Sequence, residues 1–139
     1  MAFLFDTDAV SEALKPRPAP AYMKWLATVS KAEQFVSAVT VAEMFEGAHR
    51  LADPQPYTTR ISDLVLPAFA VLAVDTEVAK LFGRLAGGLF RAGTRIADMD
   101  LMIAATAIAH DLDLVTGNIR HFDRVPGLRI CHVLAGARR

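Results

Sequence analysis

At 139 residues, of which 53% are hydrophobic, the chain is expected to form a single domain, residues 1–139, that buries roughly two thirds of its unfolded surface. Fifteen basic residues balance fifteen acidic ones, which argues against a polybasic nucleic-acid coat and against a membrane-surface protein. A single cysteine excludes an internal disulfide framework, and the start Met1–Asp6 has no basic leader, so we expect a cytoplasmic protein.

The first half of the chain alternates apolar runs with helical patterns. Ala2–Phe5 is typical of a strand buried on both faces. Two helical patterns follow this strand, and the proline-rich segment Lys15–Pro20 lies between them. The elements predicted here are a strand at Ala2–Phe5, helices at Asp6–Leu14 and Tyr22–Val29, a strand at Phe35–Val39, and helices at Thr40–Ala52 and Tyr57–Ala68.

The second half continues the alternation. The predicted elements are a strand at Val71–Val74, a helix at Asp75–Ala92 interrupted by Gly87-Gly88, a helix within Arg95–His110, a strand at Leu112–Thr116, a loop at Gly117–Val125 and a strand at Arg129–Val133. Strands that alternate with helices predict an α/β fold, a three-layer α/β/α sandwich around a parallel sheet.

The segment Leu101–Ala109 is apolar at every position but one, so this helix is predicted to be buried on all sides. Asp98 and Asp100 stand at its start. Asp98 suits an N-cap, whereas Asp100 lies about 200° further round the helix and cannot share that role. A carboxylate that leads into a buried helix needs a counter-charge or a cation nearby.

Polar residues also follow the other strands. Asp6 comes after the first strand, Glu43 soon after the second, and Asn118 after the fourth, so with Asp100 they are expected to converge at one sheet edge. Such oxygen donors suit Mg²⁺ or Mn²⁺, and none of the four histidines has the spacing of a zinc site. Each residue also has a purely structural alternative: Asp6 as a helix cap, Thr40 and Glu43 as a capping box, and Asn118 as a turn residue.

Four segments together resemble PIN-domain ribonucleases. They are L-F-D-T-D, S-A-V-T-V-A-E-M, I-A-D-M-D-L-M-I-A-A-T-A and L-V-T-G-N-I-R-H-F, and they span nearly the whole chain in order. Within that family the chain is similar to the VapC-type toxins of toxin–antitoxin pairs, and specifically to FitB-like proteins. The resemblance implies strand order 3-2-1-4-5 and a Mg²⁺- or Mn²⁺-dependent endoribonuclease that an antitoxin holds inactive.

The resemblance also implies roles for individual residues. Asp6, Glu43 and Asp100 match the metal-binding acids of the family, and Asn118 takes the fourth catalytic position. The residues expected to support these acids are Thr116 and Asp98, and the candidate contacts to RNA phosphates are Arg95, Arg120 and Arg124.

The surplus of apolar residues indicates partner interfaces. We expect a homodimer, and a groove formed by the Tyr22–Val29 face and the Thr40–Leu51 helix that accepts an amphipathic helix of the antitoxin. DNA is expected to be bound only through the antitoxin, and no membrane association is expected.

Two alternatives remain open. F-L-F-D-T-D-A-V also resembles the motif of haloacid-dehalogenase-like phosphatases, in which Asp6 would be the nucleophile and Asp8 the acid. The other alternative is a PIN-like module that binds RNA or a partner without cleaving it. Its basis is that Asn118 and His121 stand where relatives carry aspartate.

Overall fold

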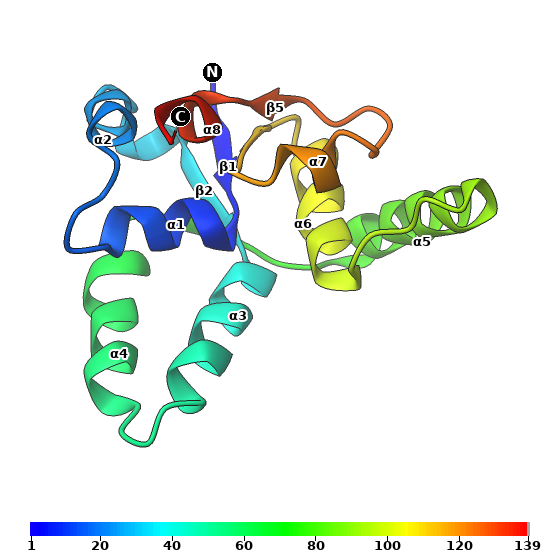
Figure 1. Ribbon diagram of the computed structural model, residues 1–139. Helices are drawn as coiled ribbons and strands as arrows, with labels where there is room; N and C mark the ends of the chain where they lie inside the picture. The colour runs from blue at the N-terminus through cyan, green and yellow to red at the C-terminus, as the bar shows by residue number, and fades with distance from the viewer. Residues whose placement is uncertain (139) are drawn as a thin grey trace.

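The computed structural model describes residues 1–138, which form a five-stranded parallel sheet with helices packed on both faces (Figure 1). The strands are β1 Phe3–Phe5, β2 Gln34–Ser37, β3 Ala70–Leu72, β4 Asp113–Val115 and β5 Ile130–Cys131. Their order is β3-β2-β1-β4-β5, which confirms the predicted order 3-2-1-4-5. The order in which strands are added to the sheet therefore reverses between β1 and β4, and ligands of open α/β sheets bind at such a point.

The α-helices are α1 Thr7–Leu14, α2 Pro20–Leu26, α3 Ala38–His49, α4 Gln55–Arg60, α5 Thr76–Ala92, α6 Asp98–Ala109, α7 Ile119–Phe122 and α8 Val133–Ala137. A 3₁₀ turn, η1 Lys31–Glu33, precedes β2, and a π-helical turn, η2 Ile61–Val65, follows α4. None of the helices within residues 1–138 combines the length and apolar character needed to cross a lipid bilayer.

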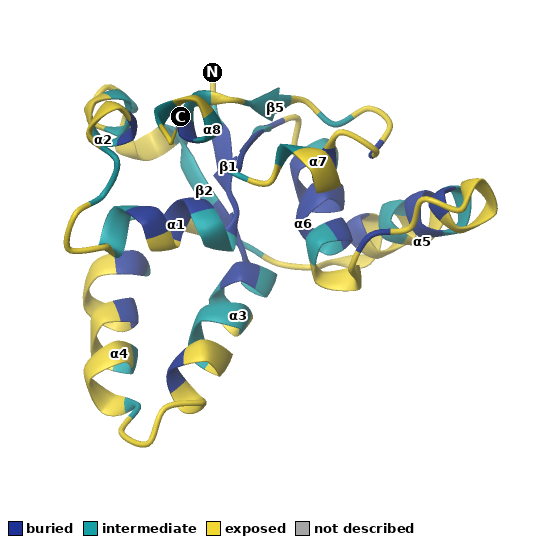
Figure 2. Ribbon diagram, in the orientation of Figure 1, coloured by how far each residue is buried: buried dark blue, intermediate teal, exposed yellow. Residues whose placement is uncertain are grey.

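Two hydrophobic clusters, one on each face of the sheet, produce the three layers. Because side chains alternate along a strand, Leu4 of β1 points into the cluster formed with α5, α6 and α7. Its neighbours Phe3 and Phe5 point into the other cluster, which contains residues of α1, α2, α3, η2 and α8. The burial colours of Figure 2 show β1 enclosed between these layers. The predicted three-layer α/β/α sandwich is confirmed.

Helix α6 is the buried helix that the sequence predicts. Its residues Leu101 and Ile103–Ala107 are buried, including the single polar one, Thr106, whose hydroxyl donates to the Met102 carbonyl at 2.8 Å. The prediction that Leu101–Ala109 is buried on all sides fails at the carboxyl end, because Ala109 is exposed.

Several predicted boundaries are wrong. Strand β2 ends at Ser37, whose hydroxyl accepts a hydrogen bond from the Val39 N–H at 3.0 Å, so α3 begins two residues earlier than predicted. Val133 begins α8 instead of ending a strand, and the loop predicted at 117–125 contains α7. The pair Gly87-Gly88 does not interrupt α5.

The predicted groove face Tyr22–Val29 is also wrong. Tyr22 is fully buried, its hydroxyl donates to the Ala9 carbonyl at 2.9 Å, and Trp25 packs edge-on against Phe3 with ring centroids 5.1 Å apart. These aromatic side chains belong to the core, so they are not available to line a groove for a partner.

Candidate functional site

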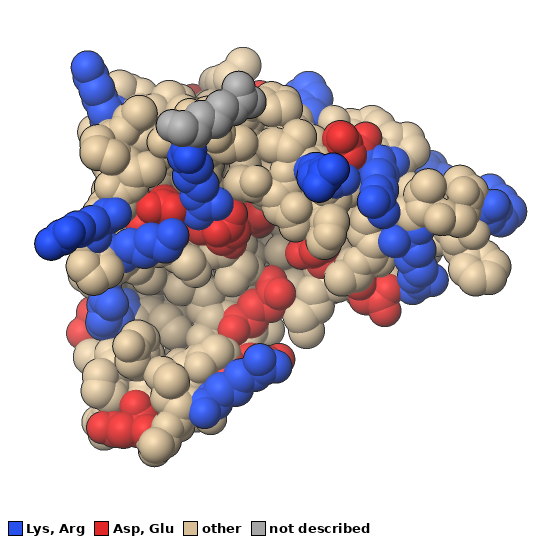
Figure 3. Space-filling model, viewed as in Figure 1, with Lys and Arg blue, Asp and Glu red and all other residues tan. Residues whose placement is uncertain are grey.

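A pocket of about 420 Å³ lies at the carboxyl ends of β1 and β4. Figure 3 shows acidic side chains gathered near the centre of this face. The pocket is lined by Asp6, Thr7, Asp8, Glu43, Asp100, Gly117, Asn118 and Phe122. The structure thus brings together all four predicted catalytic residues, while their catalytic roles stay predictions.

Asp6 is both a helix cap and a member of the pocket. Its carboxylate accepts a hydrogen bond from the Ala9 N–H at 2.8 Å, which caps α1, and its side chain is almost fully buried. Burial raises the pKa of Asp6 to about 7, hydrogen bonds from Thr116 and the Ala9 N–H oppose that rise, and the charges of Asp8 and Asp100 add to it. The cap alternative is therefore correct for Asp6, and it does not account for the neighbouring acids.

Glu43 does not belong to a capping box. Ser37 is the N-cap of α3, and Thr40 is buried inside the helix. The Glu43 Oε1 atom instead accepts a hydrogen bond of 2.5 Å from the hydroxyl of Thr7 on α1. Because this contact crosses from α3 to α1, it directs the carboxylate to the pocket.

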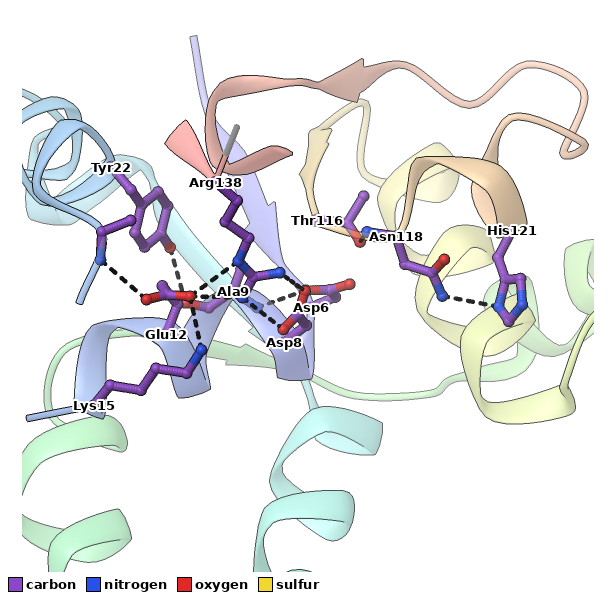
Figure 4. Close-up of polar contacts among 11 residues, drawn as sticks. Asp6, Asp8, Ala9, Glu12, Lys15, Tyr22, Thr116, Asn118, His121 and Arg138 are labelled. Carbon is purple, nitrogen blue, oxygen red and sulfur yellow. Dashed lines mark hydrogen bonds and ion pairs between the residues drawn. The ribbon is translucent and has the colours of Figure 1, made fainter. Parts of the chain in front are cut away.

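Asp100 and Asn118 approach each other through His121. The Asp100 Oδ2 atom lies 3.5 Å from His121 Nδ1. The same His121 nitrogen lies 2.9 Å from the Asn118 amide nitrogen, a contact that Figure 4 shows. The backbone N–H of Asn118 donates to the hydroxyl of buried Thr116 at 2.9 Å. Thr116 therefore contacts both Asp6 and Asn118, in agreement with its predicted supporting position.

Asp98 lies outside the pocket. Ala97 is the N-cap of α6 and makes no side-chain cap, so the prediction that Asp98 caps this helix is wrong. Asp98 is exposed and accepts a hydrogen bond from the Arg95 guanidinium at 2.6 Å. Neither side chain lines the pocket. Arg120 and Arg124 are exposed on α7 and just after it, outside the pocket lining.

One residue beside the pocket has no sequence signal. The guanidinium of Arg138, at the end of α8, donates to Asp8 and to Glu12 on α1 (Figure 4). The hydrogen bonds from Arg138 to Glu12, together with the Ala19 N–H and Lys15, hold the pKa of Glu12 at about 2, against the opposing effect of its burial. The contact to Asp8 joins residues 130 positions apart, so no local motif could indicate it.

Comparison with known proteins identifies the family. The PIN domain family model matches residues 3–128. The chain belongs to the PIN domain family. Among its relatives, the tRNA(fMet)-specific endonuclease VapC of Salmonella typhimurium is 28% identical over 130 residues, covering 94% of this chain and 96% of that protein. Toxin FitB of Neisseria gonorrhoeae is 32% identical, covering 86% of this chain and 89% of that protein.

Solved structures agree with this assignment. The crystal structure of VapBC2 from Rickettsia felis bound to a DNA fragment from their promoter matches with a TM-score of 0.85 at 26% identity, covering 94% of this chain and 98% of that one. The resemblance to VapC and FitB proteins is therefore confirmed, and the phosphatase alternative is wrong. Arg138 lies beyond the segment that the family model matches.

The pocket of this PIN domain suits a hard cation by its donor chemistry. Its polar ligand atoms are carboxylate, amide and hydroxyl oxygens, as Mg²⁺ and Mn²⁺ prefer. Within residues 1–138, no lysine or arginine forms a salt bridge with Asp6, Glu43 or Asp100. No three acids, histidines or cysteines of this part of the chain already stand at metal-binding spacing, so binding requires side-chain movement into a common shell.

Proposed function

We propose that this PIN domain is a divalent-metal-dependent endoribonuclease that acts as the toxin of a toxin–antitoxin pair. The observation that carries the proposal is the oxygen-lined pocket of a PIN fold, in which Asp6, Glu43 and Asp100 line one cavity and none of them pairs with a described lysine or arginine. Mg²⁺ or Mn²⁺ is the proposed cofactor, and these three carboxylates are its proposed ligands. RNA is the proposed substrate, in line with the nuclease relatives of this chain.

When bound, the divalent ion would supply a water of lowered pKa and neutralise charge on the scissile phosphate. The carboxylates of the chain would bind this ion and orient its water. Asp6 is fixed by its cap bond and Glu43 by Thr7, so these two acids keep their directions without a ligand. Glu43 and Asp100 are the groups that could accept the proton of the attacking water. Asn118 adds a neutral donor at the fourth position.

Glu43→Gln tests the proposal directly. Glutamine can still accept the Thr7 hydrogen bond, so the free energy of unfolding in EDTA should stay within about 1 kcal/mol of the wild type, the scale of one neutral hydrogen bond. Cleavage should collapse, because glutamine lacks the negative charge that a divalent ion requires.

The assay follows cleavage of structured RNAs with Mg²⁺ or Mn²⁺ and with EDTA. Initiator tRNA is included because a relative of this chain is a tRNA(fMet)-specific endonuclease. Asp98→Asn is the matched control, since it neutralises an acid of α6 outside the pocket and should leave cleavage unchanged. An active Glu43→Gln protein would contradict the site, and an inactive wild type would favour the module that binds without cleaving.

A second, more apolar groove suits the proposed antitoxin. It lies between α1, α3 and α4, has a volume of about 630 Å³, and borders the first pocket at Thr7 and Glu43. Its apolar lining residues are Leu14, Met44, Ala48, Leu51, Tyr57 and Ile61. We propose that an amphipathic helix of the antitoxin occupies this groove, that DNA is bound only through the antitoxin, and that the toxin is a homodimer.

A further inference from the structure

Arg138 connects the end of the chain to the acidic pocket. Its Nη1 and Nη2 atoms donate to the two carboxylate oxygens of Asp8 at 2.7 and 2.9 Å. Its Nε and Nη2 atoms donate to Glu12 Oε1 at 3.0 and 2.7 Å. A guanidinium that grips one carboxylate with two nitrogens fixes the direction of that carboxylate as well as balancing its charge.

The loop after β4 leaves room for this ion pair. A Cβ atom added at Gly117 would collide with Arg138 Nη1 and would lie 2.5 Å from Asp8 Oδ2. The ion pair therefore packs directly over the Gly117 backbone, at a position where any other residue would push it away. Asp8 and Gly117 both line the acidic pocket, so the pair forms one side of it.

Asp8 is a potential additional ligand of that pocket. It follows Asp6 by two residues, and its charge already contributes to the raised pKa of Asp6. Arg138 turns the Asp8 carboxylate toward α8, as Figure 4 shows, and engages both of its oxygens. Without that partner, a fourth free carboxylate would stand beside Asp6, Glu43 and Asp100.

We propose that Arg138 is a positioning residue that holds Asp8 out of the metal-ligand set and so keeps coordination positions open for water and phosphate. This inference rests on the proposed metal-dependent nuclease function. Arg138 is the C-cap of α8 and lies after residues 3–128, the segment that the PIN family model matches.

The proposal predicts opposite effects of Arg138→Ala on binding and on catalysis. Release of Asp8 adds negative charge and a possible ligand, so Mn²⁺ should bind at least about threefold more tightly. The value of kcat for RNA cleavage should fall at least about tenfold, the range seen when groups that orient metal ligands are removed. Mn²⁺ affinity is measured by electron paramagnetic resonance titration without RNA, and kcat and KM by cleavage of a labelled RNA. A purely structural role would weaken binding and slow cleavage together.

Two further variants keep the test independent of folding. Gly117→Ala should displace the same ion pair from the other side and give the same pair of effects, tighter Mn²⁺ binding with slower cleavage. Arg138→Ala combined with Asp8→Asn removes the released carboxylate, so it should return Mn²⁺ affinity and kcat to within about threefold of the wild type.

Arg129→Ala is the matched charge control. Arg129 also holds two carboxylates, Asp111 at 2.6 Å and Asp113 at 2.7 Å, outside the acidic pocket. Its loss should change neither measurement. A wild type that neither binds Mn²⁺ nor cleaves RNA would overturn both the proposed function and this inference. This inference alone would be overturned if the wild type is active but Arg138→Ala leaves Mn²⁺ affinity and kcat unchanged or lowers both. It would also be overturned if the double variant does not regain the Mn²⁺ affinity and kcat of the wild type.

Discussion

Asp6→Asn provides the sharpest test of the electrostatics of the pocket. Asparagine is as good an N-cap as aspartate, so the hydrogen bond from the Ala9 N–H can be kept while the charge is removed. In EDTA, the variant should therefore be more stable than the wild type wherever Asp6 would be ionised in the folded protein.

The size of this effect follows from the pKa of Asp6. Burial raises that pKa from 3.8 to about 7, so the folded state holds a proton that the unfolded state releases between these pH values. The free energy of unfolding then falls as pH rises through this range. At 1.36 kcal/mol per pH unit, the cost of ionising Asp6 is at most about 4 kcal/mol, fully present above pH 7 and absent below pH 4.

Urea unfolding in EDTA at pH 4 and pH 8 measures this cost. The stability advantage of Asp6→Asn over the wild type should grow between the two pH values by up to about 4 kcal/mol. Asp75→Asn is the matched control, because Asp75 caps α5 through the Val78 N–H at 3.0 Å and is exposed. An advantage of Asp6→Asn that changes by less than about 0.5 kcal/mol, the scale of ordinary surface substitutions, would refute the reasoning.

Three further outcomes are expected. Leu51→Asp should abolish binding of the antitoxin, measured by calorimetry, and leave RNA cleavage unchanged, because Leu51 lines the apolar groove and not the acidic pocket. Glu12→Gln should destabilise the protein near neutral pH, and this deficit should vanish in urea melts as pH falls from about 4.5 towards 2, because the lowered pKa of Glu12 stabilises the fold only while its carboxylate is ionised. Thr116→Val should cost about 1–3 kcal/mol of unfolding free energy by removing a buried hydroxyl that contacts Asp6 and the Asn118 N–H.

The architecture of the site was predictable because it follows from chain direction. A short apolar run that ends in Asp6 identifies β1 and its carboxyl end, and an apolar helix headed by Asp100 must be buried next to the sheet. Once the strands are parallel, these acids have to meet at the same edge. The convergence of Asp6, Asp100 and Asn118 needed only the alternation of elements and the resemblance to PIN domains.

Local cap signals were less reliable because several residues compete for one cap. Thr40 and Glu43 match a capping box, yet Ser37 lies closer to the end of β2 and caps α3 first. Asp98 has the right type for an N-cap of α6, but Arg95 pairs with it at 2.6 Å and Ala97 takes the position. Such choices depend on where the preceding strand or loop ends, which a propensity does not specify.

Contacts distant in sequence were beyond prediction. Arg138 reaches Asp8 because α8, which follows the edge strand β5, packs against α2 and so brings Arg138 beside α1. The apolar face of α2 was misassigned for a related reason, since the same periodicity describes a helix that binds a partner and one that covers a core. Tyr22 is in fact covered by its own chain.

Burial of Asp6 links the stability of the fold to cation binding. A proton held with a pKa of about 7 must leave before the carboxylate can bind a divalent ion. If one proton is displaced per ion, the apparent Kd for Mn²⁺ should rise about tenfold for each pH unit below 7 and level off above it. The same ion should stabilise the wild type by RT ln(1 + [Mn²⁺]/Kd), so the rise in Tm on adding Mn²⁺ should be large at pH 8 and small at pH 5. Asp6→Asn should lose most of this rise in Tm at every pH, because the variant lacks the carboxylate from which the ion displaces a proton. A Kd for the wild type that does not change between pH 5 and pH 8 would show that the ion binds without Asp6.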